Sequence, residues 1–583
     1  MYNASENDLR FAIHEVLEDS VKEKLSEKFD LTPDLIDAIL SEAAKLNSDV
    51  IAPLNHAGDQ EGCSWNPQNT VTTPKGWKDA HKALSEQGWC GLETAEEYGG
   101  QGLGRILGSC FAEMLHSANM AFALCHLLTQ GQIHALQLFG SDAQKATYVP
   151  KLASGEWTGT MNLTEPQAGT DLGALRTTAT KDGDHYRIKG QKIYITYGEH
   201  DMAENIVHLV LARTPDAPEG VKGISLFIVP KFLVNEDGSL GPRNDVKCVS
   251  IEHKLGINGS PTAVLAFGED EGAIGYLVGE ENKGLNYMFA MMNNARFGVG
   301  IQGLAISNRA YYQALDYAQT RVQGVPLDRA SGDTIIHHPD VQRLLAKMRA
   351  EIEAMRNLMI YGAAMEDLAH ISDDPTLTAR SEFMVPIMKA WCTERSLELT
   401  SDGVQIHGGM GFIEETGAAQ HYRDARILPI YEGTTAIQAN DIMFRKTMRD
   451  KGATATALLD EIQAAADAST LPVAIPLKEA VAIARDALAV ITDGGLSTRE
   501  QAGVSVSYLM MMGAVSCAWM MLRVAEAAKT ADASAWRSEF LQQKEQLAEI
   551  FMANTLGRVQ DYAHQIKAGA KSTEAITAEL LSA

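Results

Sequence analysis

One acidic residue lies where its neighbours are almost all apolar. Glu432 follows the apolar residues 427–431 in the segment ILPIYEGTTAIQAN and directly precedes Gly433. A carboxylate that is shielded from water becomes more basic, because desolvation disfavours its charged form. Glu432 is therefore a candidate for proton transfer. Gly433 has no Cβ atom, so it would let a ligand approach closely.

Two segments nearer the N-terminus could hold a polar or flat ligand. In MNLTEPQAGTDLGALRTTA (residues 161–179), Thr164, Gly169 and Thr170 offer hydroxyls and backbone N–H groups that suit a phosphate or a polar ring edge. In KIYIT, we expect Tyr194 and Thr196 on one face of a strand, since side chains two apart point the same way. An ordinary turn and a half-buried strand face would explain the same residues.

Two further segments end predicted helices. TRVQG contains Arg321, whose forked guanidinium could hold a pyrophosphate, although such an arginine is more often a solvated charge. SDGVQIHGGMGF (residues 401–412) indicates a helix end followed by a glycine-rich turn. It is not a dinucleotide-binding fingerprint, because no strand precedes it and its glycine spacing differs.

The predicted elements that would position these residues change along the chain. Helical spacing dominates at first, short β-branched runs predict a mainly antiparallel sheet from about Thr158, and helical spacing then resumes. Gly452 indicates a linker before a last helical block. We expect five parts: an N-terminal helical extension (1–40), an α domain (41–157), a β domain (158–282), an α-bundle domain (283–450) and an additional helical domain (455–583).

Composition disfavours several classes of function. Fifty Lys plus Arg against seventy-five Asp plus Glu give a net charge of −25, which disfavours nucleic acid and anionic lipid as partners. Seven cysteines without CxxC pairs predict reduced thiols in a cytoplasmic protein. The first residues show no basic segment followed by an apolar one, so we expect no signal peptide. The sixteen histidines show no HExxH pattern, so we expect no metal site.

One uncharged stretch is long enough to cross a membrane. Residues 503–522 (GVSVSYLMMMGAVSCAWMML) carry no charge over twenty positions. Their serines, their glycine and the helical periodicity that continues beyond Arg523 favour a buried bundle helix over a membrane span.

Ten segments, taken in order, resemble the acyl-CoA dehydrogenase family over residues 90–445. They are ETAEEYGGQG, MNLTEPQAGTD, IKGQKIYITYG, GISLFIVP, HKLGINGS, LVGEENKGLNYM, NNARFG, RVQG, DGVQIHGGMGF and YEGTT. The additional N-terminal and C-terminal helices resemble the longer members, most closely those of the 3-(methylthio)propanoyl-CoA dehydrogenase type.

The resemblance implies an α+β fold and a flavin cofactor. The expected fold has an N-terminal helical domain, a β-barrel-like antiparallel sheet domain, a C-terminal four-helix bundle and an additional helical domain. The resemblance also implies bound FAD and a homo-oligomer, either a dimer or a dimer of dimers.

The resemblance assigns cofactor contacts residue by residue. The residues that match contacts to the flavin region are Leu163, Thr164, Gly169, Thr170, Tyr194, Thr196 and Thr434. Those that match contacts to the adenine and pyrophosphate end, contributed by a neighbouring subunit, are Arg321, Gln323, Gln405 and Gly409.

The resemblance also implies a reaction. Glu432 matches the base that removes an α-proton from an acyl-CoA thioester while the β-hydrogen leaves as hydride to flavin N5, giving the trans-2-enoyl-CoA. The residues expected near the substrate are Thr170, Asn293, Arg296 and Gly433. The implied substrate is a short acyl-CoA or 3-(methylthio)propanoyl-CoA, and the implied electron acceptor is an electron-transfer flavoprotein.

The sequence departs from the family pattern at three positions. Tyr194 stands where many members have tryptophan, which should preserve packing on the flavin. Ala436 replaces a frequent glutamine, so no cofactor contact is expected there. Asn293 replaces a common aspartate on the helix of Arg296, which changes the local charge balance.

Two alternative functions remain open at this point. An acyl-CoA oxidase would use the same first half-reaction and pass its electrons to oxygen, although the C-terminal LLSA is not a peroxisomal address. A non-catalytic flavin-binding relative acting on nucleic acid would need a basic face, which the net charge disfavours.

Overall fold

The structure is a computed structural model that describes residues 2–327, 329–372 and 374–583. It divides into two compact units. The first unit comprises Met1–Lys45, Ser109–Ser117 and Arg296–Ala583, and the second comprises Leu46–Gly108 and Ala118–Ala295. The α+β fold predicted from the sequence is confirmed, because a helical unit and a curled sheet with its own helices are both present.

Helices build the first unit. Their bounds are α1 (Glu6–Phe11), α2 (Asp19–Phe29), α3 (Pro33–Leu46), α6 (Arg105–Ala118, in part), α9 (Gly284–Thr320, from Arg296 onward), α10 (Pro339–Ile371), α11 (Pro375–His407), α12 (Ala418–Ala425), α13 (Thr435–Asn440), α14 (Ala453–Ala468), α15 (Ala474–Thr492), α16 (Thr498–Thr530), α17 (Ser538–Asn554), α18 (Arg558–Ala575) and α19 (Ala578–Ser582). Short 3₁₀ or π turns connect several of them: η1 (Ala12–Val16), η8 (Ile335–His337), η9 (Gly408–Phe412), η10 (Glu414–Thr416) and η11 (Asp441–Thr447).

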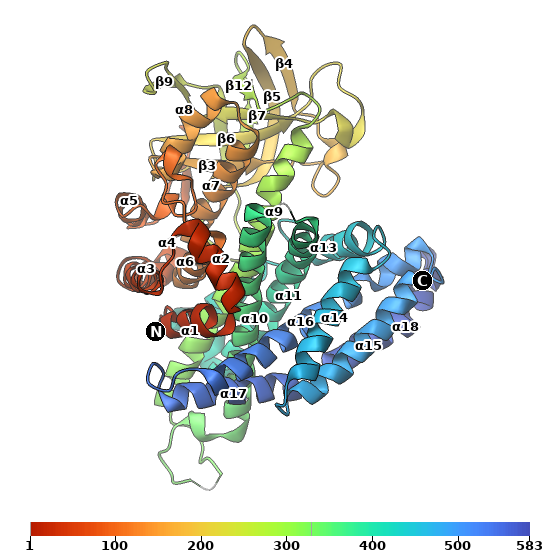
Figure 1. Cartoon of the computed structure of the whole chain (residues 1–583). Coiled ribbons are helices and arrows are strands. Elements are labelled where there is room, and N and C mark those ends of the chain that lie inside the picture. The colour runs from red at the N-terminus through yellow and green to blue at the C-terminus, as the bar shows by residue number, and fades with distance from the viewer. Residues whose placement is uncertain (1, 328, 373) are drawn as a thin grey trace. The chain divides into compact units, whose positions relative to one another are not determined.

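The long apolar segment noted in the sequence forms the centre of helix α16. Ser497 and Glu500 make a capping box at its start, which fixes where the helix begins. Within the described residues, α16 is the one helix whose length and composition would allow a membrane span, and 89% of its most apolar window is buried. It packs against α10, α11, α15, α17 and α18 (Figure 1). This burial is what a bundle helix requires.

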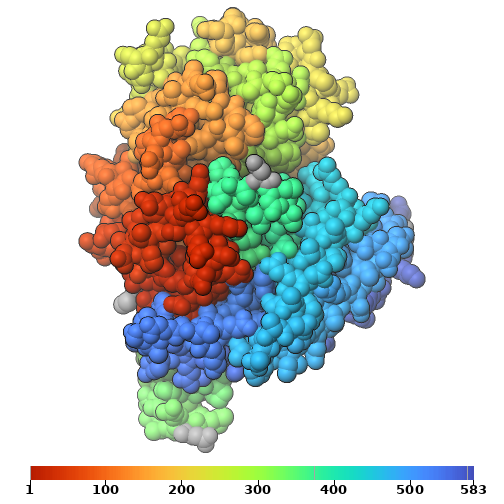
Figure 2. All heavy atoms as spheres, in the orientation of Figure 1, coloured from red at the N-terminus to blue at the C-terminus, as the bar shows by residue number. Residues whose placement is uncertain are grey.

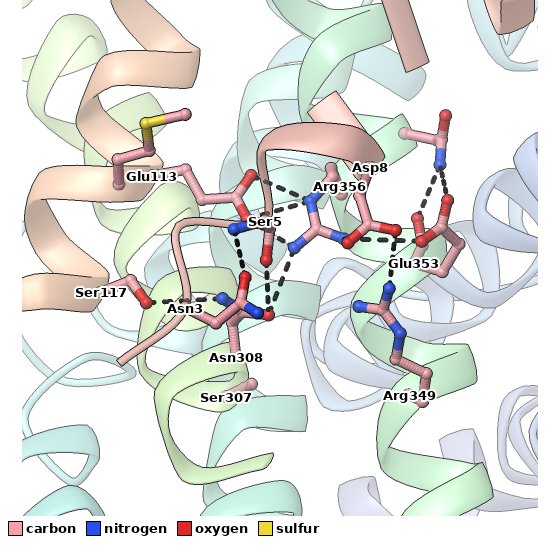
Figure 3. Close-up of polar contacts among 12 residues, drawn as sticks. Asn3, Ser5, Asp8, Glu113, Ser117, Ser307, Asn308, Arg349, Glu353 and Arg356 are labelled. Carbon is pink, nitrogen blue, oxygen red and sulfur yellow. Dashed lines mark hydrogen bonds and ion pairs between the residues drawn. The ribbon is translucent and has the colours of Figure 1, made fainter. Parts of the chain in front are cut away.

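A buried network of charges joins the N-terminal residues to this bundle (Figure 3). The Asp8 carboxylate accepts from Arg349 at 2.6 Å and from Lys544 of α17 at 2.8 Å. Arg356 of α10 pairs with Glu113 of α6 at 2.7 Å, and Lys544 also bonds to Glu353. Helix α17 therefore lies beside the N-terminal helices, as Figure 2 shows on one face.

The second unit combines helices with strands. Its helices are η2 (Asn47–Ile51), η3 (Ala52–Leu54), α4 (Asn55–Glu61), α5 (Trp77–Glu86), η4 (Trp89–Gly91), η5 (Glu96–Tyr98), α7 (Met120–Phe139), α8 (Asp142–Ala153), η6 (Leu172–Ala174), η7 (Gly220–Gly223) and the start of α9. Its strands are β1 (Ser64–Asn66), β2 (Thr70–Thr72), β3 (Trp157–Asn162), β4 (Thr178–Asp182), β5 (His185–Thr196), β6 (Asn205–Ala212), β7 (Ser225–Pro230), β8 (Phe232–Val234), β9 (Leu240–Arg243), β10 (Val246–Ile251), β11 (Thr262–Phe267) and β12 (Ala273–Leu277).

The main sheet has the order β10-β11-β5-β12-β7-β6-β3, with β4 paired to β5. β3 and β6 pair in parallel, and the other pairs of this sheet are antiparallel. The long strand β5 pairs with β4 and β12 through its first half and with β11 through its second, so the sheet curls along it. Strands β6 and β7 are buried throughout, because apolar layers pack on both of their faces.

Candidate active site

The turn that carries Glu432 has an unusual backbone. It lies between helices α12 and α13, and both Glu432 (φ 54°) and Gly433 (φ 89°) are in the left-handed region. Glycine adopts this conformation freely, but a residue with a Cβ atom is strained there. Strained conformations of this kind cluster at functional sites, where the surrounding structure holds them in place.

Local hydrogen bonds define both ends of the turn. Tyr431 N–H donates to Ile427 O at 3.1 Å, and Thr435 N–H donates to Pro429 O at 3.0 Å. Thr434 caps helix α13, since its hydroxyl oxygen accepts from the N–H of Ile437. The cofactor contact predicted for Thr434 would therefore use a side chain that is already oriented by the helix start.

Two buried side chains bond to the carbonyls of the turn. Lys389 Nζ, from α11, donates to Leu428 O at 2.9 Å and to Gly433 O at 2.8 Å. Gln438 Nε2, from α13, donates to Glu432 O at 3.1 Å. Both side chains are fully buried. The strained backbone of the turn is thus held from two different helices.

The Glu432 side chain is left available for chemistry. Within the described part of the chain, its carboxylate accepts no hydrogen bond, and no cation lies within 4 Å of it. Burial raises the pKa of Glu432 to about 7, while the charges of Arg296 and Lys389 act to lower it. A carboxylate with a pKa near 7 can take up a proton at physiological pH.

Arg296, which the resemblance implied near the substrate, interacts with the Glu432 carboxylate through its charge. It is buried on α9, its Nη1 lies 3.8 Å from Asp441 Oδ2, and it interacts electrostatically with Glu432. Burial lowers its pKa, and the charges of Asp441 and Glu432 oppose that shift. The first unit therefore brings together Arg296, Glu432, Gly433 and Thr434.

The residues predicted for the adenine and pyrophosphate end lie at two neighbouring helix ends. Helix α9 ends at Thr320 and α11 ends at His407, and the rings of Tyr317 and His407 stack with centroids 4.5 Å apart. The four predicted residues are all exposed. Arg321 and Gln323 follow the end of α9, Gln405 lies in the last turn of α11, and Gly409 follows the end of α11.

In the second unit, a buried ion pair supports the predicted flavin loop. Lys192 of β5 donates to Leu163 O at 3.0 Å and to Glu165 Oε1 at 2.8 Å. Burial opposes the charge of Glu165, but Lys192 together with hydrogen bonds from Thr177 and Arg176 lowers the pKa of that carboxyl to about 2. Glu165 therefore stays ionised and fixes the shape of the loop.

The loop presents open, polar backbone. Leu163 is buried and Thr164 half-buried, whereas Gly169 and Thr170 are exposed, and a Cβ atom added at Gly169 would meet nothing within 4 Å. This surface has room for a ring edge. Asn293, on the part of α9 that belongs to this unit, is also exposed.

A β-bulge exposes Tyr194 beside this loop. The register between β5 and β11 shifts between Ala263 and Leu265, and Tyr194 (φ 61°) lies in the extra turn of backbone. Bulges commonly redirect a side chain, and the Tyr194 ring is 61% exposed, while Ile195 is buried and Thr196 half-buried. An exposed aromatic ring, a hydroxyl and the open backbone at Gly169 fit a flat heteroaromatic cofactor such as flavin.

Sequence reasoning missed Lys389 and Gln438 entirely. Both lie in helical runs whose spacing indicates only burial, and a buried lysine leaves no motif. Gln302, which accepts from the Tyr431 hydroxyl, was missed for the same reason. The single available signal for Lys389 was a cation within the apolar stretch FMVPIMKAW.

Comparison with known proteins covers nearly the whole chain. The descriptions matched are the N-terminal domain (37–156), middle domain (160–269) and C-terminal domain (282–446) of acyl-CoA dehydrogenase, and an acetyl-CoA dehydrogenase C-terminal-like domain (458–577). The 3-methylmercaptopropionyl-CoA dehydrogenase of Ruegeria pomeroyi is 48% identical over 95% of this chain and 96% of that protein.

Solved structures show the same fold. An acyl-CoA dehydrogenase from Bacillus anthracis, solved with FAD, has a TM-score of 0.76 at 22% identity and covers 100% of this chain and 94% of its own. A chain from the structure of the electron transferring flavoprotein of Acidaminococcus fermentans has a TM-score of 0.61 at 29% identity, over 72% of this chain and 100% of its own. The chain therefore belongs to the acyl-CoA dehydrogenase family and is an FAD-dependent oxidoreductase that dehydrogenates an acyl-CoA thioester.

Proposed function

We propose that Glu432 is the base that removes the α-proton of the acyl-CoA, and that 3-(methylthio)propanoyl-CoA is the preferred substrate. The role of Glu432 as the base is supported by the state of its carboxylate, which has a pKa of about 7 and no hydrogen-bond partner among the described residues. The second part is supported by the 48% identity to a 3-methylmercaptopropionyl-CoA dehydrogenase.

The residues of the turn would share the work of the reaction. The carboxylate of Glu432 takes the proton from Cα, the β-hydrogen leaves with its electron pair, and the new C=C bond completes the trans-2-enoyl thioester. Bound FAD supplies the two-electron acceptor. The N–H of Glu432 donates to no acceptor in the described part of the chain, so it is available to the thioester oxygen as enolate charge develops.

The proposed cofactor contacts follow from two surfaces. On the second unit, Tyr194, Thr196 and the loop at residues 163–170 would contact the flavin region. On the first unit, Arg321 and Gln323 beside Gln405 and Gly409 would hold the adenine and pyrophosphate end, because a forked cation with amide groups suits a pyrophosphate. Thr170, Asn293 and Gly433 would lie near the substrate.

Changing Arg321 to Ala tests the cofactor assignment. Arg321 is exposed, so we expect an intact fold and FAD affinity weaker by about tenfold, as loss of one charge-assisted contact predicts. Arg329→Ala, an exposed arginine of the same loop, is the matched control and should keep its FAD. Equal FAD affinity in both variants would remove Arg321 from the site.

An electron-transfer flavoprotein is the proposed electron acceptor. Structural similarity to a chain from an electron transferring flavoprotein structure supports this choice over oxygen. The acceptor is tested by measuring hydrogen peroxide during aerobic turnover. Peroxide formed at the same rate as enoyl-CoA would identify an oxidase instead.

A homo-oligomer is also proposed, with a second copy of this chain covering the two helix ends. Six apolar side chains around the predicted adenine-binding residues are 45–84% exposed: Val322, Val325, Leu327, Met410, Phe412 and Ile413. Exposed apolar groups of this size favour a protein interface. Light scattering of the FAD-loaded protein should give the mass of a dimer or tetramer, and a monomer would contradict the proposal.

A cytoplasmic location is the last part of the proposal. All seven cysteines are free thiols, as reducing compartments favour. Cell fractionation tests this location, and recovery from a membrane or periplasmic fraction would contradict it.

The substrate is tested by anaerobic bleaching of the flavin with a panel of acyl-CoAs. We expect 3-(methylthio)propanoyl-CoA and short acyl-CoAs to bleach it fastest. Faster bleaching by long acyl-CoAs would overturn the substrate proposal but leave the reaction unchanged.

A further inference from the structure

We propose that Lys389 is the positioning residue for the catalytic base: it fixes the turn at residues 428–433 and supplies a buried positive charge that favours ionised Glu432. This inference rests on the proposed role of Glu432 as the base. One buried lysine of α11 would then control both the position and the ionisation of the reacting carboxylate.

The geometry follows from the two bonds of the ammonium group. Lys389 Nζ reaches Leu428 O at 2.9 Å and Gly433 O at 2.8 Å, so one group holds carbonyls on both sides of Glu432. Charged donors make shorter and stronger hydrogen bonds than neutral ones. The ends of a six-residue turn are thereby fixed to helix α11.

The backbone of the turn needs such support. Glu432 and Gly433 are consecutive residues in the left-handed region, and glutamate adopts it only under strain. Gln438 bonds to Glu432 O at 3.1 Å from the following helix. Without Lys389, the carbonyls of Leu428 and Gly433 would lose a buried donor, and the turn could relax to an unstrained form that aims the carboxylate elsewhere.

The charge of Lys389 acts on Glu432 directly. No carboxylate forms an ion pair with Lys389 within the described residues, and Glu432 and Glu394 are the acids that favour its charged form. Burial lowers the pKa of Lys389 to about 8, so the lysine still carries its proton while Glu432 titrates near pH 7. The buried cation thereby keeps more of the base ionised at neutral pH.

The other charges around Glu432 come from three elements. Arg296 of α9 also favours its ionised form and is itself paired with Asp441 of η11. The Tyr431 hydroxyl, held by Gln302, has its pKa raised by burial and by Glu432, and stays neutral. Lys389 differs from a general positive charge because it also donates hydrogen bonds to two carbonyls of the turn, Leu428 O and Gly433 O.

The test measures how the rate of anaerobic flavin bleaching by acyl-CoA depends on pH in FAD-loaded protein. In Lys389→Met, we expect the rising limb of the pH–rate profile to move to higher pH by about one unit, because a nearby cation no longer lowers the pKa of Glu432. The plateau rate should also fall by about tenfold or more, because a base that is misplaced slightly loses much of its effect. Lys389→Arg keeps the positive charge and the N–H donors, so the rising limb of its pH–rate profile should return most of the way to the wild-type position.

Two further variants keep the outcome decisive. Lys389→Gln retains a donor without the charge, so its limb should still move if Lys389→Met does not fold. Lys544→Met removes another fully buried lysine, which bonds to Asp8 and Glu353, and should lower Tm without moving the limb.

A wild-type pH limb in folded Lys389→Met or Lys389→Gln would overturn the inference. Failure of the proposed base is distinguished by Glu432→Gln: normal bleaching of that variant would remove Glu432 as the base. A Glu432→Gln variant that does not bleach, beside a Lys389→Met variant with the wild-type limb, would contradict only the role of Lys389.

Discussion

At the scale of single residues, the Glu432 carboxylate is a compromise between stability and chemistry. Burial raises its pKa from 4.5 to about 7, so the folded protein binds this proton more tightly than the unfolded chain does. The resulting stabilisation is full below about pH 4.5 and is lost as pH rises through about 7. At neutral pH the folded protein therefore contains an ionised carboxylate whose burial lowers the free energy of unfolding.

The pH dependence of stability follows from this shift. Relative to wild type, Glu432→Gln should become more stable as the pH rises from 5 to 8.5. The gain in the free energy of unfolding should stay below about 3 kcal/mol, because the Glu432 side chain is only partly buried. Thermal unfolding of both proteins with FAD bound at the two pH values checks this. A Tm difference that does not change with pH would contradict the raised pKa.

At the scale of elements, the turn before α13 is more demanding than its sequence indicates. YEGTT predicts a turn, and Gly433 was expected to allow close approach of a ligand. The structure adds a second reason, because Gly433 has a φ of 89° and a Cβ atom there would lie 2.7 Å from Gln438 Nε2. That amide is one of the two donors that hold the turn.

Gly433→Ala should therefore damage both stability and activity. We expect a loss of about 1–3 kcal/mol in the free energy of unfolding, from backbone strain and displacement of Gln438, and a fall in kcat/KM. Gly494→Ala is the matched control, since Gly494 has a φ of 77° with nothing within 4 Å of its Cβ position. Equal effects on kcat/KM in the two variants would show that the turn does not position the base.

At the scale of the whole molecule, a buried network ties the N-terminal residues to α10 and α17. Figure 3 shows the part of it that joins Asp8 and Glu113 to α10. Its ions are Asp8, Arg349, Lys544, Glu353, Arg356 and Glu113. Although burial opposes its charge, the cations around Asp8 hold its pKa well below the usual range. The stabilisation from Asp8 is therefore present above about pH 4 and is lost only as pH falls further.

Asp8→Asn should be strongly destabilising. Removing one partner of a buried ion cluster leaves uncompensated charges, and we expect a loss of about 3–5 kcal/mol in the free energy of unfolding. Asp19→Asn, which breaks an exposed pair with Lys22, should have a far smaller effect. Denaturant unfolding measures both, and equal midpoints would contradict a structural role for the network.

Sequence patterns could predict those features that are local in the chain. The alternation of helix and sheet, the buried helix α16 and the candidacy of Glu432 all follow from periodicity or from short motifs. The contacts of Lys389 with Leu428 and Gly433 join residues about forty positions apart, and no pattern predicts such contacts. The bulge that exposes Tyr194 depends on the register with β11, which a single strand does not specify.

The boundaries of the five expected domains and the individual cofactor contacts stay predictions. Their positions depend on how separate surfaces meet around a ligand, and composition and spacing do not encode that geometry. The buried network was also beyond the sequence, because its acids and cations come from the N-terminal residues, α6, α10 and α17.

Anaerobic bleaching of Glu432→Gln measures directly whether Glu432 removes the substrate α-proton. We expect this variant to be folded, yellow and loaded with FAD, yet to bleach with 3-(methylthio)propanoyl-CoA at least about a thousandfold more slowly than wild type. Bleaching at the wild-type rate would contradict this role of Glu432 and direct the search for the base to Glu414 and Glu415.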